Sequence, residues 1–281
     1  MNITDSQQQG YPPLRRQTAR RSRVTTIITM PRLLRTCVIT LMTLVVLGTY
    51  LTLGLAPVAS ATTGHGVDQG FSTSWSGFAL DAMPGTYHQV SADLVVPGPQ
   101  ICTSSRLPTS SWYYWAGLDG YKSDTVEQVG VALFCSGHKS TYTAWYEAFP
   151  HGFVSAHTLR IHSGQRLRLV VSALRDHHFR LTIALISKSA PLLFNRVITV
   201  PRALTDSAEC IMENPNTHTQ AITSTVEFTA CQVNHAPLIK GNSNPTSLTL
   251  IDPKGVVQDT LTPLNPTGGF KLMTRPPPAK R

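Results

Sequence analysis

The sequence predicts an all-β fold, an antiparallel sandwich or barrel, for most of its length. Apolar and polar residues alternate with period two in successive short runs, and Val, Ile, Thr and aromatic residues dominate these runs. No long segment with helical periodicity appears outside residues 36–57. Gly, Pro, Asn, Asp or Ser bound each run, as expected where strands end in turns. About a dozen short strands with this spacing are typical of a sandwich or a barrel.

The first expected strand is Tyr87–Val96, which ends at a Pro-Gly-Pro stop. Further runs of the same kind follow in order at Thr125–Phe134, Thr141–Phe149, Arg166–Ala173, Phe179–Ile186, Arg196–Val200, Ala221–Thr229 and Ser247–Ile251. Side chains alternate between the two faces of a strand. In the second run, Gln128 therefore shares a face with Val126, Gly130 and Ala132, whereas Glu127 points to the opposite face with Val129, Val131 and Leu133.

Residues 1–61 are interpreted as a basic leader and a secretory signal. An almost uncharged run at 36–57 follows a basic region and precedes Val58-Ala-Ser-Ala61, a small-x-small cleavage pattern. Met30 begins an ordinary signal start and is a candidate for the true first residue. These features predict export of residues 62–281, and an uncleaved single-span anchor is the alternative.

The net charge of the chain is concentrated in this leader. The 281 residues contain 24 Lys and Arg against 15 Asp and Glu, a formal charge of +9. Seven of these bases and one of these acids precede residue 36, so the rest of the chain carries only about +3. A nucleic-acid surface needs clustered Lys and Arg, and residues 62–281 contain no such cluster. A nucleic-acid partner is therefore not expected.

The cysteines support an oxidising compartment. Cys37 lies in the signal, and the remaining four form an even set. Pairs Cys102–Cys135 and Cys210–Cys231 are favoured because each joins segments that are close in sequence; buried free thiols are the alternative. No Cys-x-x-Cys pair indicates zinc.

Several enzyme classes lack their motifs. The sequence has no Gly-x-Ser-x-Gly elbow, no His-Glu-x-x-His, no phosphate-binding Gly loop and no dinucleotide fingerprint. A cross-strand pair of Glu127 and Glu147 is left open as a glycosidase acid and nucleophile. Aromatic clusters at Trp112–Trp115 and Trp145-Tyr146 are candidates for a sugar platform. A carbohydrate-binding or carbohydrate-cleaving protein therefore stays as an alternative.

Six ordered blocks between about residue 71 and 274 carry a family resemblance. They are Ser74-Trp-Ser-Gly-Phe78, Val90-Ser-Ala-Asp-Leu-Val-Val-Pro97, Trp115-Ala-Gly-Leu-Asp-Gly120, Val126-Glu-Gln-Val-Gly130, Tyr142-Thr-Ala-Trp-Tyr-Glu-Ala-Phe-Pro150 and Ala208-Glu-Cys-Ile-Met-Glu213. Together they resemble the glutamic peptidases (eqolisins). The resemblance places a peptidase domain at 71–274, between a short linker at 62–70 and a basic, Pro-rich tail at 275–281 that is expected to be disordered.

The resemblance implies a fold, a site and an activity. It implies a concanavalin-like sandwich of two bent antiparallel sheets with the site on a concave face. Glu209 would be the general base and then acid, and Gln128 would orient the water and stabilise the oxyanion. The residues implied to line the cleft or support this pair are Trp115, Asp119, Trp145 and Tyr146. The family implies a secreted, monomeric, acid-acting endopeptidase that cleaves polypeptides without metal or cofactor and is insensitive to pepstatin.

Two positions depart from the family pattern. Ala132 stands where the best-known fungal members have a second acid four residues after the Gln, and Cys210 stands where the residue after the catalytic Glu is usually Trp. Loss of an acidic neighbour changes the pKa of a site. A catalytically inactive extracellular binding module with the same fold is therefore a further alternative.

Overall fold

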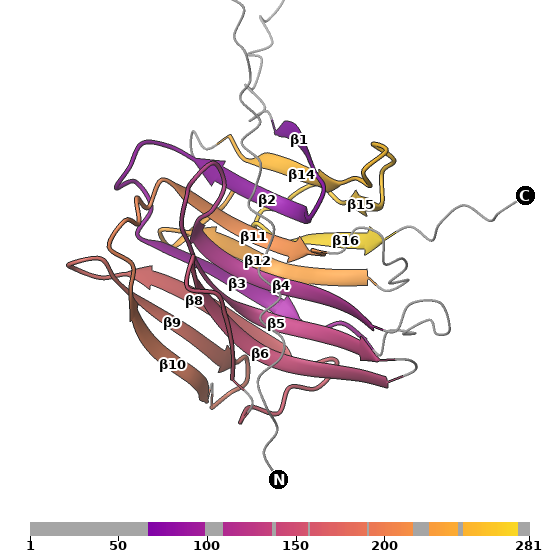
Figure 1. Ribbon diagram of the computed structural model, residues 1–281, viewed down its shortest axis with the longest axis horizontal. Helices are drawn as coiled ribbons and strands as arrows, with labels where there is room; N and C mark the ends of the chain where they lie inside the picture. Colours follow the sequence, from indigo (N-terminus) through magenta and orange to yellow (C-terminus); the bar gives the residue numbers. More distant parts are fainter. Residues whose placement is uncertain are drawn as a thin grey trace, which may run out of the picture. The chain divides into compact units, whose positions relative to one another are not determined.

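The computed structural model describes residues 67–98, 109–136, 139–156, 158–189, 191–215, 225–240 and 244–274. These residues form sixteen β-strands in two large sheets, without a helix among the described residues (Figure 1). All strand pairs in the described part are antiparallel except β1 with β14. The predicted all-β sandwich is therefore confirmed.

The first sheet contains eight strands, and its three longest strands are neighbours. Their order is β1 (Asp68–Ser72), β14 (Thr246–Leu250), β2 (Trp75–Asp81), β11 (Ser207–Glu213), β4 (Thr109–Asp119), β5 (Val126–Ser136), β6 (Lys139–Phe149) and β7 (Phe153–Ser155). Segments far apart in the sequence thus become neighbours. Strand β11 lies between β2 and β4, more than eighty residues before it in the chain.

The second sheet packs against one face of the first. Its order is β10 (Leu192–Thr199), β9 (His178–Leu185), β8 (Arg166–Ala173), β3 (Gln89–Val95), β12 (Thr225–Val233), β16 (Phe270–Thr274) and β15 (Asp259–Leu261), and the short β13 (Ala236–Pro237) pairs with β12. Strands β3, β8 and β9 alternate between buried and more exposed residues along their length. This alternation is typical of a sheet with one face in the core and the other in water.

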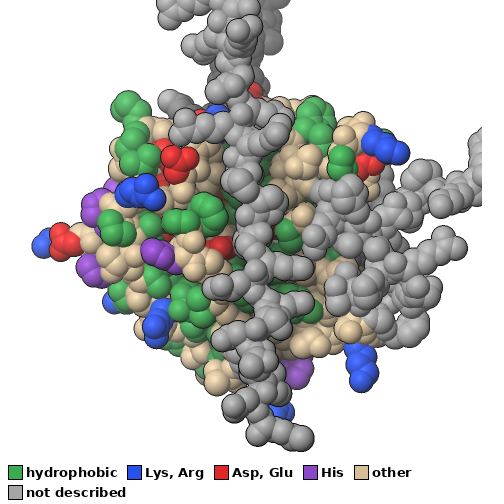
Figure 2. Space-filling view, in the orientation of Figure 1, with side chains coloured by type: hydrophobic (Ala, Val, Ile, Leu, Met, Phe, Trp, Pro, Cys, Tyr) green, Lys and Arg blue, Asp and Glu red, His purple; other side chains and the backbone are tan. Residues whose placement is uncertain are grey.

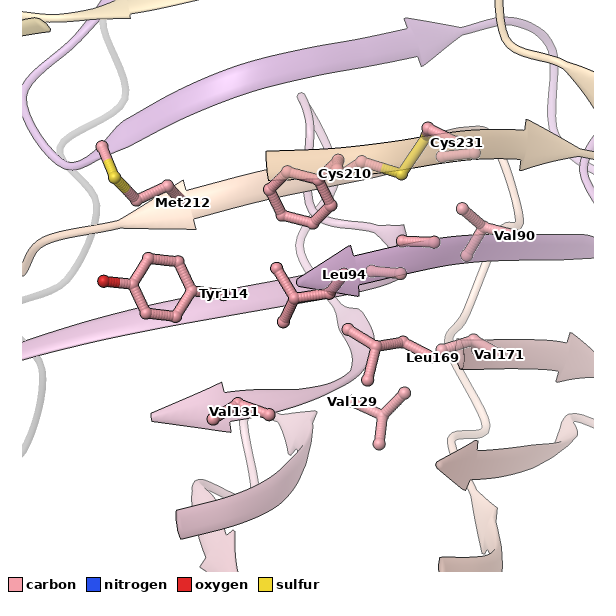
Figure 3. Packing of buried hydrophobic residues seen from close by; sticks show 14 of the residues in the cluster. Val90, Leu94, Tyr114, Val129, Val131, Leu169, Val171, Cys210, Met212 and Cys231 are labelled. Atoms are coloured by element: carbon pink, nitrogen blue, oxygen red, sulfur yellow. A yellow bond between two sulfur atoms is a disulfide. The ribbon is translucent and has the colours of Figure 1, made fainter. Parts of the chain in front are cut away.

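The core lies between the two sheets. Its buried side chains come from both, including Leu94 and Leu169 of the second sheet and Tyr114 and Val131 of the first (Figure 3). A disulfide joins Cys210 on β11 to Cys231 on β12 across this core, with an S–S distance of 1.98 Å (Figure 3). The predicted pair Cys210–Cys231 is therefore confirmed. Cys135 is also disulfide-bonded, and its expected partner Cys102 lies outside the described residues.

Most expected strands occur within a few residues of their predicted positions. The largest differences are β10, which begins at Leu192 rather than Arg196, and β12, which extends to Val233 rather than ending at Thr229. The leader, the signal and the tail at 275–281 lie outside the described residues. None of the described residues belongs to a helix with the length and apolar character needed to cross a membrane.

Charged side chains are spread over the described surface. In Figure 2 the basic and acidic groups on the visible face lie mostly toward its edges, and in places a basic group lies beside an acidic one. Ion pairs among the described residues join single partners, such as Arg168 with Asp93 and Lys122 with Asp81.

Candidate active site

Four residues of the first sheet stand in one row across neighbouring strands. In the strand register Glu209 on β11 is opposite Gly117 on β4, Gly117 is opposite Gln128 on β5, and Gln128 is opposite Glu147 on β6. Residues opposite one another point to the same face of a sheet. The register therefore brings together the two residues predicted to be catalytic, although eighty residues separate them in the chain.

This row lies on the face of the first sheet that points away from the core. The alternate residues of β5, Val129, Val131 and Leu133, belong to the core between the sheets, so Gln128 points the other way. The two faces of β5 therefore carry the side chains that the sequence predicts for them. A separate apolar cluster, which includes Trp115, Ala132, Trp145 and Ile211, surrounds the row on its own face.

Gly117 lies between the two predicted catalytic residues in the row and makes room for the indole of Trp115. Two strand spacings separate Glu209 and Gln128, about 10 Å between their Cα atoms at about 4.8 Å per strand. A β-carbon at position 117 would lie 2.8 Å from Cζ3 of Trp115 and 3.3 Å from Cβ of Gln128. The first distance is shorter than two carbon atoms tolerate, so the indole occupies the place of the missing side chain.

Gln128 is buried and is oriented by a carboxyl group. Its Nε2 donates a hydrogen bond of 2.8 Å to Oε2 of Glu147, while its Oε1 has no partner among the described residues. The amide nitrogen carries two hydrogens, and this bond uses one of them. One N–H and the carbonyl oxygen are therefore left to bind another molecule.

Glu209 is fully buried and is held by one backbone donor. The N–H of Tyr121 donates to its Oε1 at 3.0 Å, and no described group bonds to its Oε2. Burial raises the pKa of Glu209 well above its ordinary value, whereas the neighbouring Ser207 hydroxyl and the Tyr121 N–H act in the opposite direction. The free Oε2 is the atom available to exchange a proton.

Aromatic side chains form the floor next to the row. In the register Trp115 is opposite Gly130, and Gly130 is opposite Trp145, so the missing side chain separates two indoles. Trp75 packs edge-on against Trp115 at a centroid distance of 5.0 Å. The Nε1–H of Trp145 has no partner among the described residues and is a free donor beside the site.

Two further acids, Glu213 and Glu147, lie beside the aromatic floor. The Nε1–H of Trp115 donates to Oε2 of Glu213 at 3.0 Å. Burial, followed by the charge of Glu147, raises the pKa of Glu213 to about 7, and N–H groups of Trp115 and Trp75 act against this shift. Burial raises the pKa of Glu147 to about 7 as well, opposed by the bond from Gln128. Both acids therefore hold protons in mildly acidic solution.

Asp119 supports the site from the end of β4 and does not line the row. Its backbone has a left-handed φ of 61°, and Gly120 follows with φ 103°. Its carboxylate accepts backbone N–H groups of Leu204 and Asp206, each at 2.9 Å. Asp119 therefore ties the end of β4 to the segment that leads into β11.

Tyr146 lies on the other face of β6. It packs against the core between the sheets, and its ring is 5.5 Å from that of Phe194 on β10. Strand alternation puts it opposite to Trp145, which shares the face of Gln128. Tyr146 was expected either to line the cleft or to support the catalytic pair. Its position does not allow direct contact with the substrate, but it is compatible with support from the core side of the sheet.

The hypothesis that Glu127 and Glu147 form a glycosidase acid and nucleophile pair is wrong, because the strand register separates them. Glu147 is opposite Gln128, whereas Glu127 is opposite Leu118 and Ala148. Glu127 and Glu147 therefore point to opposite faces of the first sheet and cannot flank one glycosidic bond. Among the described residues, no three His, Cys, Asp or Glu side chains are arranged to hold a metal ion.

Sequence reasoning missed several residues that contact the predicted pair. Glu147, the Tyr121 N–H and Gly117 are the closest of these, and Glu213 joins them through Trp115. Glu147 and Glu213 belong to the family-like blocks, which was a usable signal. The contact of Tyr121 depends on a turn between β4 and β5 and left no mark in the sequence.

The chain resembles known peptidases in sequence and in fold. The sequence model described as the peptidase A4 family matches residues 73–268. Among curated proteins, no sequence matches the chain significantly.

Similar folds occur in crystal structures of peptidases. Scytalido-glutamic peptidase, solved with a transition state analog inhibitor, is 19% identical with a TM-score of 0.56, over 73% of this chain and 99% of that chain. The same peptidase with a peptide-based transition state analog gives 20% and 0.54 over the same shares. SCP-B, a member of the eqolisin family in a complex with the tripeptide Ala-Ile-His, gives 20% and 0.51, again over 73% and 99%. At these identities the likeness establishes the fold.

Proposed function

Because the chain belongs to the peptidase A4 family, we propose that it is a secreted, acid-acting endopeptidase in which Gln128 and Glu209 activate a water molecule. The observation that carries this proposal is the row Glu209–Gly117–Gln128–Glu147 on one face of the first sheet. A carboxyl and an amide stand on either side of a residue without a side chain. We propose that a water molecule and the substrate carbonyl react between these two groups.

In the proposed reaction the ionised Glu209 takes a proton from water at its free Oε2. The water oxygen attacks the carbonyl carbon of the substrate, and the carbonyl oxygen becomes an oxyanion. The remaining N–H of Gln128 donates to this oxyanion, which favours the tetrahedral intermediate. Glu209 then gives its proton to the leaving amine, the C–N bond breaks, and no covalent enzyme intermediate forms.

Glu147 orients the amide of Gln128 in this scheme. The 2.8 Å bond fixes Nε2 on the side of β6, and the second N–H of the amide is left to bind another molecule. Oriented donors stabilise a developing charge better than donors that must reorganise during the reaction. Glu147 is accordingly proposed as a positioning residue for Gln128.

The floor beside the row is suited to an extended polypeptide. Trp115 and Trp145 are buried in the apolar cluster beside the row, and we propose that the free Nε1–H of Trp145 donates to a backbone carbonyl of the substrate. Ala132 is buried on the same face of β5, four residues after Gln128. The best-known fungal members have an acid at this position, so the present chain lacks that charge. We propose that apolar side chains of the substrate pack on this floor.

The pH range of activity follows from the protonation of Glu209. A general base must be ionised, and burial raises the pKa of Glu209 well above its ordinary value. The rate should therefore increase with pH on the acid side until Glu209 ionises. We propose a mildly acidic optimum rather than one near pH 2.

Secretion is supported by the signal-like residues 36–61 and by the Cys210–Cys231 disulfide, which is typical of an oxidising compartment. Polypeptides are the proposed substrates, and the protein is proposed to act as a monomer.

The test is digestion of unfolded casein and of a peptide library from pH 2 to 7 with pepstatin present. Wild type is compared with Glu209→Gln, which keeps the size of the side chain and removes its basic form. We expect cleavage by wild type and a loss of kcat/KM of about 10²–10⁴-fold in the variant. Circular dichroism should give nearly the same folded signal for both.

Retained cleavage by Glu209→Gln would disprove the proposed base. A folded wild type that cleaves nothing between pH 2 and 7 would instead favour the binding-module alternative, for which Ala132 and Cys210 are the motivating departures.

A further inference from the structure

The outer edge of β6 is open along its first half. β6 lies at the border of the first sheet, where the short β7 follows it (Figure 1). β7 pairs with residues 145–147 of β6, and a bond of 2.8 Å from the N–H of Ala156 to the C=O of Ala144 extends this pairing by one residue. Before Ala144, no described residue pairs with the outer edge of β6.

The outward backbone groups of this open edge belong to Ser140 and Tyr142. In an antiparallel strand, the N–H and C=O groups of successive residues point alternately to the two edges. Because the C=O of Ala144 points to the outer edge, the backbone groups of Tyr142 and Ser140 point there as well. Free N–H and C=O groups along an edge are a template for another strand.

A pocket lies beside the open edge. After β7 the N–H of Leu159 donates to the C=O of Ala156 at 3.0 Å, and this turn ends the pairing with β6. The chain that follows and the first half of β6 together line a pocket of about 550 Å³, formed by residues 140–143 and 159–163. This volume lies within the range of about 300–1,000 Å³ that is typical of ligand sites.

The pocket is at the edge of the strand and not on one of its faces. Thr143 is opposite Ala132 and therefore shares the face of Gln128, and Thr141 shares this face by alternation. Tyr142 points to the core face, and all three line the pocket. A molecule in the pocket would therefore lie next to the backbone of β6.

The lining of the pocket carries positive charge. Arg160 and His162 line it and are exposed, and Lys139 precedes its first lining residue on β6. None of the lining residues is acidic, and no ion pair joins Arg160 to an acid in the described part of the chain. A carboxylate of a bound molecule would therefore complement this surface.

The open edge is held in place from its other sides. The hydroxyl of Tyr142 donates at 2.9 Å to the C=O of Pro97 and lies at the same distance from the C=O of Gly98. The inner edge of β6 pairs with β5 over the whole length of both strands. Backbone groups that are already ordered reduce the entropy lost when a partner binds.

We propose that the open edge of β6 binds an extended, acidic segment of a polypeptide as an added strand. The backbone of the segment bonds to Ser140 and Tyr142, and one of its carboxylates lies beside Arg160. Addition of a strand to a sheet edge is a common mode of peptide recognition, in which main-chain hydrogen bonds provide the affinity. The positive lining provides the preference for acidic segments.

In the proposed peptidase this segment belongs to the substrate, a step that rests on the proposed function. Thr141 is six residues from Glu147 along β6, and Glu147 stands in the row with Gln128. At about 3.3 Å per residue this separation is about 20 Å. A substrate can therefore occupy both places only if about six or more residues separate the bond that is cut from the acidic segment.

Two substitutions test the backbone and the charge separately. Ser140→Pro removes the outward N–H and adds a ring at the open edge, while the bonds between β6 and β5 do not use this N–H. Ser140→Ala keeps the N–H and is the matched control. Arg160→Gln removes the charge, and Arg180→Gln on an exposed position of β9 is its control.

Binding is measured by fluorescence anisotropy on the full-length Glu209→Gln protein, which should not cut the probe, and on the same protein with each substitution. The probe is a fluorescein-labelled eight-residue peptide of alternating Thr and Glu. A second probe has Lys in place of Glu. Two further probes carry N-methyl groups on the Thr nitrogens or on the Glu nitrogens, and each therefore has one blocked edge. Circular dichroism checks that every variant is folded.

We expect Ser140→Pro to weaken binding of the Thr–Glu probe by about tenfold or more, and Ser140→Ala to stay within about twofold. Arg160→Gln should weaken binding by about two- to fivefold, whereas Arg180→Gln should have no effect. The Lys probe should bind more weakly than the Glu probe. One of the methylated probes should lose binding, because an added strand uses one edge of the peptide.

The substrate role is tested with the active protein and two peptides that contain the same cut site. One has about eight residues, and the other has about twenty-four, including an acidic run. Ser140→Pro should raise KM for the long peptide with kcat unchanged, and should leave both constants unchanged for the short one. An equal KM for the long peptide in wild type and Ser140→Pro would overturn the substrate role.

Binding that is unchanged in folded Ser140→Pro would overturn the proposed strand addition, as would equal binding of both methylated probes and the unmodified one. Sedimentation velocity tests a different occupant. A wild-type dimer that Ser140→Pro converts to a monomer, without binding of the probe, would show that the edge joins two copies of this chain and would overturn the proposal. If wild type cleaves nothing, the proposed function fails, while the anisotropy measurement still decides what the edge of β6 binds.

Discussion

The two sheets of the domain bury their residues differently. Strands β3, β8 and β9 of the second sheet alternate, with apolar side chains in the core and polar ones toward solvent. Strands β5 and β11 at the centre of the first sheet are buried on both faces over almost their whole length. Of the buried polar and charged residues described, Asp259 is the one that belongs to the second sheet.

The first sheet therefore buries polar groups that lower stability, whereas the second sheet buries almost only apolar ones. Burial of a carboxyl or an amide lowers stability unless it is fully hydrogen-bonded. The first sheet nevertheless buries Glu127, Gln128, Glu147 and Glu209, and each has at least one side-chain oxygen without a described partner. Folding alone would favour apolar residues at such positions. The apolar core between the sheets, to which both sheets contribute, offsets the cost of burying this row.

The test with the largest expected effects compares a substitution in the proposed site with a substitution in the core. Gln128→Ala removes the proposed oxyanion donor and should lower kcat by about 10²–10³-fold. Leu169→Ala on β8, fully buried in the core, should lower the free energy of unfolding by about 2–5 kcal/mol. Urea unfolding and steady-state kinetics are measured on both variants.

The comparison holds only if each variant leaves the other property nearly intact. Gln128→Ala should unfold close to wild type, and folded Leu169→Ala should keep its kcat/KM. A Leu169→Ala protein that is stable but inactive would show that the second sheet takes part in catalysis.

The buried acids of the first sheet should make the protein more stable in acid. The pKa of Glu147 is raised from 4.5 to about 7 in the folded protein, so its neutral form is favoured there. Its contribution is complete below pH 4.5 and is lost as pH rises to 7, which is about 3 kcal/mol in total at about 1.4 kcal/mol per pH unit. Urea unfolding of wild type between pH 4 and 8 measures this slope.

Glu147→Gln should flatten this slope, because an amide accepts the bond from Gln128 without titrating. The decrease should exceed the contribution of one group, since the charge of Glu147 also raises the pKa of Glu213. Glu227→Gln, half-buried and ion-paired with Lys271 on the second sheet, is the matched control and should leave the slope unchanged. An unchanged slope in Glu147→Gln would show that protonation of Glu147 does not cause the pH dependence of stability.

The fold was largely readable from the sequence because each sheet face repeats every two residues. Prediction was best where the alternation is clean, as in Arg166–Ala173, whereas β10 and β12 of the same sheet differ from their predicted bounds by about four residues. Strands β2 and β4 gave no comparable prediction, because they are buried on both faces and their apolar residues do not alternate. Pairing of β11 between β2 and β4 depends on long-range contacts that no local pattern encodes.

The candidate site was predictable where family-like blocks marked it and less so elsewhere. Gln128, Glu209, Trp115 and Trp145 came from these blocks, and strand alternation correctly separated Gln128 from Glu127. The bond between Gln128 and Glu147 could not be predicted, because it depends on the register of β5 against β6. Sheet register is set by turns and by packing on both faces, and neither is visible in a single strand.

Gly117 gives the smallest and most local test of the difference between the sheets. A methyl group there would lie 2.8 Å from the indole of Trp115, so the ring must shift toward the gap between Gln128 and Glu209. Gly117→Ala should lower stability by about 1–3 kcal/mol and kcat/KM by up to about 10²-fold through misplacement of the reacting groups. Gly98→Ala is the matched control, because a β-carbon at position 98 meets nothing within 4 Å. If Gly117→Ala retains full activity, the space above Gly117 is not where the substrate carbonyl and water react. If it loses activity while Gly98→Ala does not, catalysis depends on a residue without a side chain between the amide and the carboxyl.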